Sequence, residues 1–242
     1  MIKSRIQPEI TKEIYAYFRK KNTEEQLKHV RSGKLSASKL GKPLLEQMLY
    51  VLGVPPKPFD DYTLGQFRRG KDTELAILEA LAPDNEQVEV KYKGAIGIID
   101  AVRNEMPYEV KSVKNSGVKY IDPDHRAYTG VKLGNALQAA FGGLALKKDY
   151  VVLLYVAADD LRTFPHILKT ADLKPEIDSI ITKFNDQMSS GELPKWEPVE
   201  AWQENPKYSD YPDWMGLDPE TAMEKLKTQF TDAFKKLTKK EA

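Results

Sequence analysis

The stretch Gly97-Ile-Ile-Asp-Ala-Val-Arg-Asn-Glu-Met-Pro-Tyr-Glu-Val-Lys-Ser112 decides how this sequence is interpreted. Two β-prone segments flank Asn104-Glu105, and a hairpin that turns symmetrically about this pair places position 100 opposite position 109. Directly opposed residues have Cβ atoms roughly 4.5–5.5 Å apart, so Asp100 and Glu109 should repel each other unless a cation lies between them. The stretch therefore predicts a hairpin that carries a cation site.

Lys111 lies two residues after Glu109, and strand alternation places both side chains on one face, with Val110 on the other. A lysine at this point can stabilise charge on a phosphate, or help to position or deprotonate an attacking water. A Glu-x-Lys motif alone is usually a solvated strand face, and Asp100 alone could simply accept backbone hydrogen bonds. The three residues together predict metal-assisted hydrolysis of a phosphodiester.

The surrounding segments predict an α/β domain with a central mixed sheet flanked by helices and with extra N- and C-terminal helices. Helical patterns cover residues 8–21, 36–52, 62–81, 131–147 and 176–188, and another helix is expected from Thr23 onwards. The β-prone segments are 88–93, 97–102, 108–114, 150–158 and 162–168, with residues 115–117 expected as a mobile loop. The central order is helix, three strands, helix, strand.

Glu74 lies on the predicted helix that precedes the three strands. We expect Leu75, Leu78 and Leu81 to form the buried side of this helix, with Glu74 at its border. A carboxylate at the border of a core needs a partner, which makes Glu74 a candidate fourth member of the site. A helical glutamate, Gly-x-x-Asp, Glu-x-Lys and a following helix favour a nuclease site more strongly together than separately.

The composition limits which chemistry this chain can perform. Its 242 residues contain no cysteine, which excludes disulfides, thiol catalysis, cysteine-bound zinc and iron–sulfur clusters. The net charge of +1 neither requires nor forbids nucleic acid. The three histidines are widely spaced, so carboxylate and backbone oxygens would hold any metal, as suits Mg²⁺, Mn²⁺ or Ca²⁺. We find no signal peptide and no apolar segment near the ~20 residues of a membrane span, and expect a cytoplasmic protein.

Four stretches resemble, in order, the motifs of PD-(D/E)XK nucleases of the RecB-like branch. They are Leu35-Ser-Ala-Ser-Lys-Leu40 for the Ser-x-Ser helix start, Gly70-x-x-x-Glu74 for Gly-x-x-x-His, Gly97-x-x-Asp100 with Glu109-x-Lys111-Ser112, and Gln138 for the glutamine of Gln-x-x-x-Tyr. The match covers about residues 35–158. The chain departs from the family at Gly142, which takes the place of the tyrosine, and in having none of the cysteines that many relatives use for an iron–sulfur cluster.

The resemblance implies a restriction-endonuclease-like core and a metal-dependent deoxyribonuclease, in an intracellular protein of a prokaryote or virus. It implies Mg²⁺ as the cofactor, with Mn²⁺ as a substitute. Asp100, Glu109, Glu74 and the carbonyl of Val110 would bind the metal, and Lys111 would act in catalysis together with Asp100 and Glu109.

Several other residues near these motifs are candidate DNA contacts. They are Gln138, Arg68, Arg69, Lys71, Lys114, Lys119 and Ser112. A solvated helix face explains residues 68–71 equally well, whereas a basic loop after Lys111 suits contacts with the phosphate backbone. The DNA-contacting role of the helix that carries Gln138 is open, because the tyrosine of the family motif is missing.

We expect one nuclease domain over residues 1–190, with a helical N-terminal part (1–60) and a catalytic core (61–190), followed by an appendage (191–242). Residues 191–216 alternate prolines with aromatic residues and predict an extended strap whose aromatic side chains pack on the core rather than stack on unpaired bases. A final helix from Asp218 carries the apolar stripe Met223, Leu226, Phe230, Phe234 and Leu237. This stripe must be buried on the chain's own core or on a second copy, so a homodimer is one expectation.

The sequence favours hydrolysis of DNA, by an exonuclease or by a structure-specific endonuclease such as a Holliday-junction resolvase. One alternative is a catalytically silent nucleic-acid-binding module of the same fold, against which the retention of Asp100, Glu109 and Lys111 argues. Another is a structural protein whose terminal helix recruits partners. That protein would bind no metal and would be indifferent to Lys111→Ala. DNA is the expected partner, and no membrane association is expected.

Overall fold

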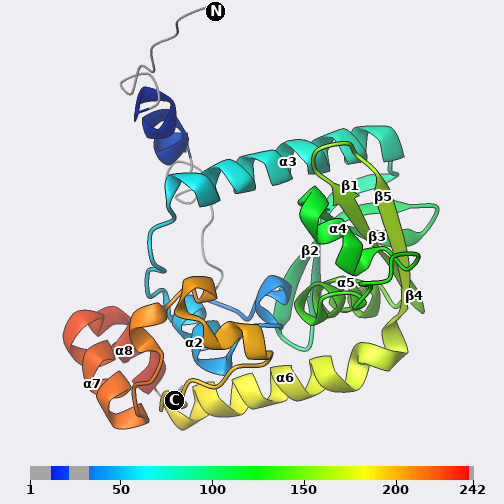
Figure 1. The fold of residues 1–242 in the computed structure, drawn as a ribbon. Helices are drawn as coiled ribbons and strands as arrows, with labels where there is room; N and C mark the ends of the chain where they lie inside the picture. Colours follow the sequence, from blue (N-terminus) through cyan, green and yellow to red (C-terminus); the bar gives the residue numbers. More distant parts are fainter. Residues whose placement is uncertain (1–11, 22–32, 240–242) are drawn as a thin grey trace, which may run out of the picture.

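A five-stranded mixed sheet forms the centre of the structure, a computed structural model that describes residues 12–21 and 33–239 (Figure 1). The strands are β1 (Asn85–Tyr92), β2 (Ala95–Arg103), β3 (Met106–Val113), β4 (Tyr150–Ala157) and β5 (Thr163–Lys169). They lie in the sheet in chain order. The strands β3 and β4 are parallel and all other neighbours are antiparallel. A parallel pair requires a crossover connection, and the helices between β3 and β4 supply it.

The helices surround this sheet and extend it towards both ends of the chain. They are α2 (Leu44–Leu52), α3 (Asp61–Leu81), α4 (Asn115–Ile121), α5 (Leu133–Ala145), α6 (Thr170–Ser190), α7 (Pro219–Gln229) and α8 (Thr231–Thr238), with the short 3-10 helices η1 (Ala37–Lys39), η2 (Ala201–Glu204), η3 (Pro206–Tyr208) and η4 (Pro212–Trp214). Residues 12–21 are also helical. The start of that predicted helix, and the helix expected from Thr23, lie outside the described residues.

The hairpin between β2 and β3 has the predicted symmetric turn. Its residue pairs are Ala101↔Tyr108, Val102↔Pro107 and Arg103↔Met106. Asn104 and Glu105 form the turn with φ angles of 48° and 64°. Two consecutive positive φ values are typical of a type I′ turn, whose twist matches that of the flanking strands. The predicted turn and its register are therefore confirmed over these three pairs, which end one position short of Asp100 and Glu109.

Both faces of the sheet are covered by helices, which explains why β4 is apolar along its length. On one face, Ile77 of α3 belongs to a cluster with Val110 and Leu154. On the other face, Ala139 of α5 packs in a cluster with Tyr155. These layers confirm the predicted α/β fold class, a central mixed sheet flanked by helices, consistent with a restriction-endonuclease-like fold. No helix in the described ranges is long and apolar enough to cross a membrane.

Two helices that were predicted as continuous are interrupted in the structure. Residues 36–52 divide into η1 and α2, because Pro43 has an extended conformation and no N–H to donate. The predicted C-terminal helix divides at Phe230, whose φ of −136° and ψ of 57° are not helical. After Lys114 the sequence predicts a mobile loop, but residues 115–121 form the helix α4, so this prediction is wrong.

The C-terminal apolar stripe packs on the chain's own core. Leu226 and Leu237 are buried in a cluster that also contains residues of α2 and α6, and Met223, Phe230 and Phe234 pack against it. Figure 1 places α7 and α8 beside α2, on the side away from the strands. The stripe therefore does not require a second copy, and the homodimer remains a prediction.

The aromatic strap packs on the core only in part. Tyr211 and Trp214 are buried, and Trp196 packs against the same cluster, as the sequence predicts. Trp202 and Tyr208 are instead 47% and 51% exposed. The packing prediction is wrong for these two because the buried residue of η2 is the polar Gln203.

Candidate active site

The candidate active site begins where the ladder between β2 and β3 gives way to a side-chain contact. Beyond the pair Ala101↔Tyr108, the backbone N–H of Val110 donates to Oδ2 of Asp100 at 2.7 Å. Asp100 is 8% exposed and Glu109 is 2% exposed, so both predicted carboxylates are buried beside the hairpin. Burial of a carboxylate is costly unless a partner compensates its charge.

Lys111 provides one such partner. Its Nζ lies 2.5 Å from Oε1 of Glu109, and its side chain is 28% exposed against 3% for that of Glu109. Lys111 also lies beside Tyr155 in the parallel pairing of β3 with β4. The predicted Glu-x-Lys motif is therefore a half-buried ion pair on the sheet rather than a solvated strand face.

Glu74 reaches the same place from α3, through a close approach of this helix to β3. A Cβ added to Gly70 would lie 3.0 Å from Oγ of Ser112, so glycine keeps the helix close to the strand. Glu74 is half-buried, as expected, but Leu75 is 55% exposed and its predicted burial is wrong. Thr73 is buried in its place, because the helix is rotated slightly relative to the predicted leucine face.

Gln87 is a member of this site that the sequence analysis missed. It lies opposite Asp100 between the β1–β2 pairs Glu86↔Ala101 and Val88↔Ile99, with a φ of 49°. Its Nε2 donates to Oε1 of Glu74 at 3.1 Å, and its hydrogen bond to Asp100 lowers the pKa of that carboxyl group. The pairing of position 87 with position 100 follows only from the β1–β2 register, for which the sequence contains no turn signal as clear as Asn104-Glu105.

Electrostatics distinguish this cluster from an ordinary ion pair. The pKa of Glu109 is raised to about 8, chiefly by burial and also by the neighbouring Asp100 and Glu74, while Lys111 opposes the rise. Burial likewise raises the pKa of Asp100, and burial followed by repulsion from Asp100 raises that of Glu74. Three carboxyl groups that resist ionisation thus surround one ammonium group.

The raised pKa of Lys111 favours its charged form, whereas the raised pKa of Glu109 favours its neutral form. Desolvation alone would lower the pKa of Lys111, but attraction to Glu109, Asp100 and Glu74 outweighs it and raises the pKa. We take Lys111 as protonated, since three acidic groups favour its charge, whereas Glu109 has only one ammonium group against two acidic neighbours. The site consequently favours an additional cation.

The donor set suits a divalent cation but is not arranged as a metal cage. No group of three or more His, Asp or Glu side chains within residues 12–21 and 33–239 is placed to hold a metal ion as it stands. Lys111 and Gln87 instead hold Glu109 and Glu74 through hydrogen bonds. Buried carboxylate oxygens match the hard ligands that Mg²⁺ prefers, so the residues fit the ion once these donors move aside.

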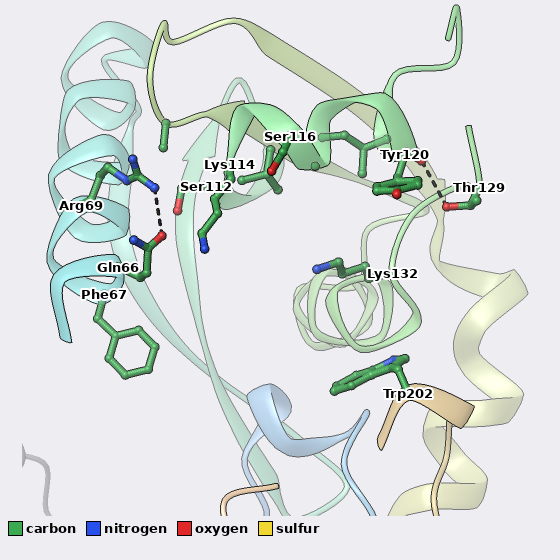
Figure 2. A pocket seen from close by; sticks show the side chains of 15 residues that line it. Gln66, Phe67, Arg69, Ser112, Lys114, Ser116, Tyr120, Thr129, Lys132 and Trp202 are labelled. Atoms are coloured by element: carbon green, nitrogen blue, oxygen red, sulfur yellow. Dashed lines mark hydrogen bonds between the residues drawn. The ribbon is translucent and has the colours of Figure 1, made fainter. Parts of the chain in front are cut away.

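A pocket of about 930 Å³ opens beside the end of β3, and we call it the β3-end pocket. Its walls include Gln66 and Arg69 of α3, Ser112 and Lys114 at the end of β3, Lys132 before α5, and Trp202 of η2 (Figure 2). Arg69 is held in place, with Nη1 2.7 Å from Oδ1 of Asp159 and Nη2 2.9 Å from Oε1 of Gln66. The pocket therefore brings together three of the predicted DNA contacts, Arg69, Ser112 and Lys114.

The remaining predicted DNA contacts lie elsewhere. Arg68 pairs with Asp72, and with Lys71 it lines a separate pocket of about 270 Å³. Lys119 lies over the ring of Tyr120, 4.9 Å from its centroid. None of these three basic residues lines the β3-end pocket.

The α5 helix explains the departure from the Gln-x-x-x-Tyr motif. Gln138 is half-buried on this helix. A Cβ at Gly142 would lie 2.8 Å from Cγ1 of Ile99, because α5 packs directly on β2. A tyrosine has no room at this position.

Comparison with solved structures supports the fold. A crystal structure described as SSO0001 matches with a TM-score of 0.53 and 16% identity, over 84% of this chain and 96% of that chain. An alkaline exonuclease, LHK-Exo from Laribacter hongkongensis, matches with TM-scores of 0.46 alone and 0.47 in complex with dAMP. Both LHK-Exo structures are 14% identical, over 64% of this chain and 90% of that chain. No family model matches the sequence, and no curated protein does.

These similarities concern the arrangement of the chain and not its chemistry. At 16% identity the SSO0001 match shows a shared fold, and the two exonuclease matches are too distant to support an argument. Function must therefore be argued from the site itself.

Proposed function

We propose that this chain is a metal-dependent deoxyribonuclease that hydrolyses phosphodiester bonds in DNA. The observation that carries the proposal is the buried cluster of Glu74, Asp100 and Glu109 around Lys111. Buried charges in a purely structural network are usually paired, because each unpaired charge is costly. Three carboxyl groups around a single ammonium group are instead suited to a divalent cation.

The residues of the cluster would have different roles in hydrolysis. Asp100 and Glu109 would hold the cation, assisted by Glu74 and the carbonyl of Val110. When bound, the cation supplies Lewis-acid stabilisation of the charge that builds up on the phosphate. Lys111 adds its positive charge at the scissile phosphate and orients the attacking water.

Hydrolysis forms one bond and breaks another at the same phosphorus atom. The water oxygen bonds to phosphorus while the bond from phosphorus to one ester oxygen breaks. The water loses a proton and the departing oxygen gains one. For Lys111 to face the phosphate, it must first release Glu109, from which it is 2.5 Å away. Binding of a cation by Glu109 would free the ammonium group for this role.

The test is digestion of three DNA substrates in Mg²⁺, with Lys111→Ala as the control. We expect the wild-type protein to cut at least one substrate and the variant to cut none. Cleavage of circular single-stranded DNA would identify an endonuclease, cleavage of linear duplex alone an exonuclease, and cleavage of a four-way junction a resolvase.

The alternatives give different results in the same experiment. A catalytically silent module would bind DNA without cutting it, and a structural protein would neither bind nor cut. Wild-type protein that leaves these three substrates and linear single-stranded DNA intact in both Mg²⁺ and Mn²⁺ would contradict the proposal.

A further inference from the structure

Three exposed aromatic side chains from three separate elements border the β3-end pocket. Phe67 of α3 is 49% exposed, Tyr120 of α4 is 45% exposed and Trp202 of η2 is 47% exposed. Figure 2 shows them around a shared opening, with the ring of Trp202 lying below Lys132. Large aromatic rings usually bury most of their surface, so three of them exposed in one pocket indicate a binding surface.

The Trp202 ring is held in place even though it is exposed. The neighbouring Gln203 is buried, and its Nε2 donates to the carbonyl of Gly41 at 2.7 Å, while its Oε1 accepts from the N–H of Val199 at 2.7 Å. Tyr208 makes a T-shaped contact with the Trp202 ring, with a centroid distance of 5.7 Å. A ring fixed before binding loses little conformational entropy when a ligand stacks on it.

Two lysines reach into the same pocket from opposite sides. Figure 2 shows Lys114, just after β3, extending downwards in this view and Lys132, before α5, pointing across the opening towards it. Lys114 donates to the hydroxyl of Tyr62 at 2.5 Å, and both of these side chains remain accessible. Positive charge beside exposed aromatic rings is the combination that binds single-stranded nucleic acid.

The pocket borders the catalytic cluster without including it. Ser112, in its wall, directly follows Lys111 in β3. The backbone N–H of Lys132 donates to the hydroxyl of Tyr155 at 3.2 Å, and Tyr155 pairs with Lys111 across the sheet. Tyr155 therefore links the Lys132 wall of the pocket to Lys111.

We infer that the β3-end pocket binds an unpaired stretch of DNA, with a base stacked on Trp202 and phosphates held by Lys114 and Lys132. This inference rests on the proposed nuclease function and specifies its substrate. The bases inside a duplex are covered on both faces by their neighbours, so only an unpaired base can use an aromatic ring in this way. The pocket volume of about 930 Å³ lies within the range of ordinary ligand sites.

Fluorescence anisotropy of the full-length protein tests the inference, with labelled oligothymidylate and a blunt duplex as separate probes in EDTA. We expect Trp202→Ala to weaken oligothymidylate binding by at least about fivefold, from a stacking contribution of about 1 kcal/mol or more. Trp202→Phe should retain most of the affinity. Lys132→Ala should reduce the dependence of log affinity on log salt by about 0.7.

Tyr150→Ala is the matched control, since Tyr150 is 46% exposed at the start of β4 and lies outside the pocket walls. It should bind both probes like the wild type. Thermal melts of each variant would identify a loss of folding, which an exposed site should not cause.

Unchanged oligothymidylate binding by a folded Trp202→Ala variant would overturn the inference. So would an equal loss for the blunt duplex. Cleavage of DNA by the wild type would leave the proposed function standing in either case. Conversely, the wild type could cut no substrate while Trp202→Ala still weakens oligothymidylate binding. That result would refute the proposed nuclease function and support the stacking site.

Discussion

Glu109 is the residue at which folding and function oppose each other most directly. Its carboxyl group is 2% exposed and has two acidic neighbours, so the fold disfavours its ionised form. A site that binds a cation requires that same form. The conflict is resolved only when a positive charge is supplied, first by Lys111 and, in our proposal, then by the divalent ion.

This conflict predicts how the stability of the metal-free protein depends on pH. The pKa of Glu109 rises from 4.5 to about 8 on folding, so the folded state binds more protons than the unfolded state between these values. The free energy of unfolding should therefore fall as pH rises through this window, by on the order of a few kcal/mol. The raised pKa values of Asp100 and Glu74 act in the same direction. The raised pKa of Lys111 makes the free energy of unfolding depend on pH only above the usual pKa of lysine, outside this window.

Thermal melts in EDTA at pH 5 and pH 8 measure this dependence. Glu109→Gln should flatten the pH profile and should be the more stable protein at pH 8. A wild-type profile that is level, or that rises over this window, would contradict the burial of an ionisable Glu109.

At the scale of secondary-structure elements, close packing of helices on the sheet explains why Gly142 is not a tyrosine and how Glu74 reaches the site. Gly142 of α5 lies against Ile99 of β2, and Gly70 of α3 lies against Ser112 of β3. In both cases the missing side chain lets a helix approach the sheet. The first contact leaves no room for a tyrosine, and the second brings Glu74 to the cluster.

Two glycines within helices provide a matched test of this packing. Gly142→Ala should destabilise the protein by about 1–3 kcal/mol, because the new Cβ would lie 2.8 Å from Cγ1 of Ile99. Gly65→Ala, in α3, has no other heavy atom within 4 Å of its new Cβ and should stabilise by about 0.5–1 kcal/mol through helix propensity. Urea unfolding of both variants measures the two effects, and a Gly142→Ala variant that is as stable as the wild type, or more stable, would show that α5 does not pack this closely.

The sequence predicts elements well where local chemistry is decisive. Asn104-Glu105 gives the correct hairpin register, and α2 ends at Leu52, where the helical pattern ends, with Gly53 in the left-handed conformation. It fails where tertiary contacts decide, as at Phe230, where the apolar stripe continues through a break in the helix. Gln87 was missed for the same reason, because its role depends on the register of β1 with β2 and on the approach of α3.

At the scale of the whole molecule, the C-terminal segment is part of the core. Leu226 of α7 and Leu237 of α8 share one buried cluster with Leu49 of α2 and Ile177 of α6. The strap that leads to these helices is fixed to α2 as well, since Oγ of Ser209 donates to Oε1 of Glu46 at 2.6 Å.

Truncation before Asp218 should therefore unfold the protein or lower its melting temperature severely, because it exposes the apolar core that α7 and α8 cover. Light scattering and thermal melts of the truncated and full-length proteins make the comparison. A truncated chain with an unchanged melting temperature would show that this segment is an appendage. Scattering of the full-length protein at tens of micromolar also tests the predicted homodimer, which a monomer would refute.

The central claim is that Asp100, Glu109 and Lys111 form a metal-dependent catalytic site, and the initial rate of DNA cleavage tests it most directly. The rates of wild-type, Asp100→Asn, Glu109→Gln, Lys111→Ala and Glu74→Gln proteins should be compared in Mg²⁺ and in EDTA. We predict that the wild-type rate rises to saturation with Mg²⁺ and vanishes in EDTA. The three central variants should be inactive in both conditions, and Glu74→Gln should lose roughly 10–100-fold, as expected of a supporting group. Wild-type cleavage that persists in excess EDTA, or full activity in Glu109→Gln, would contradict the account.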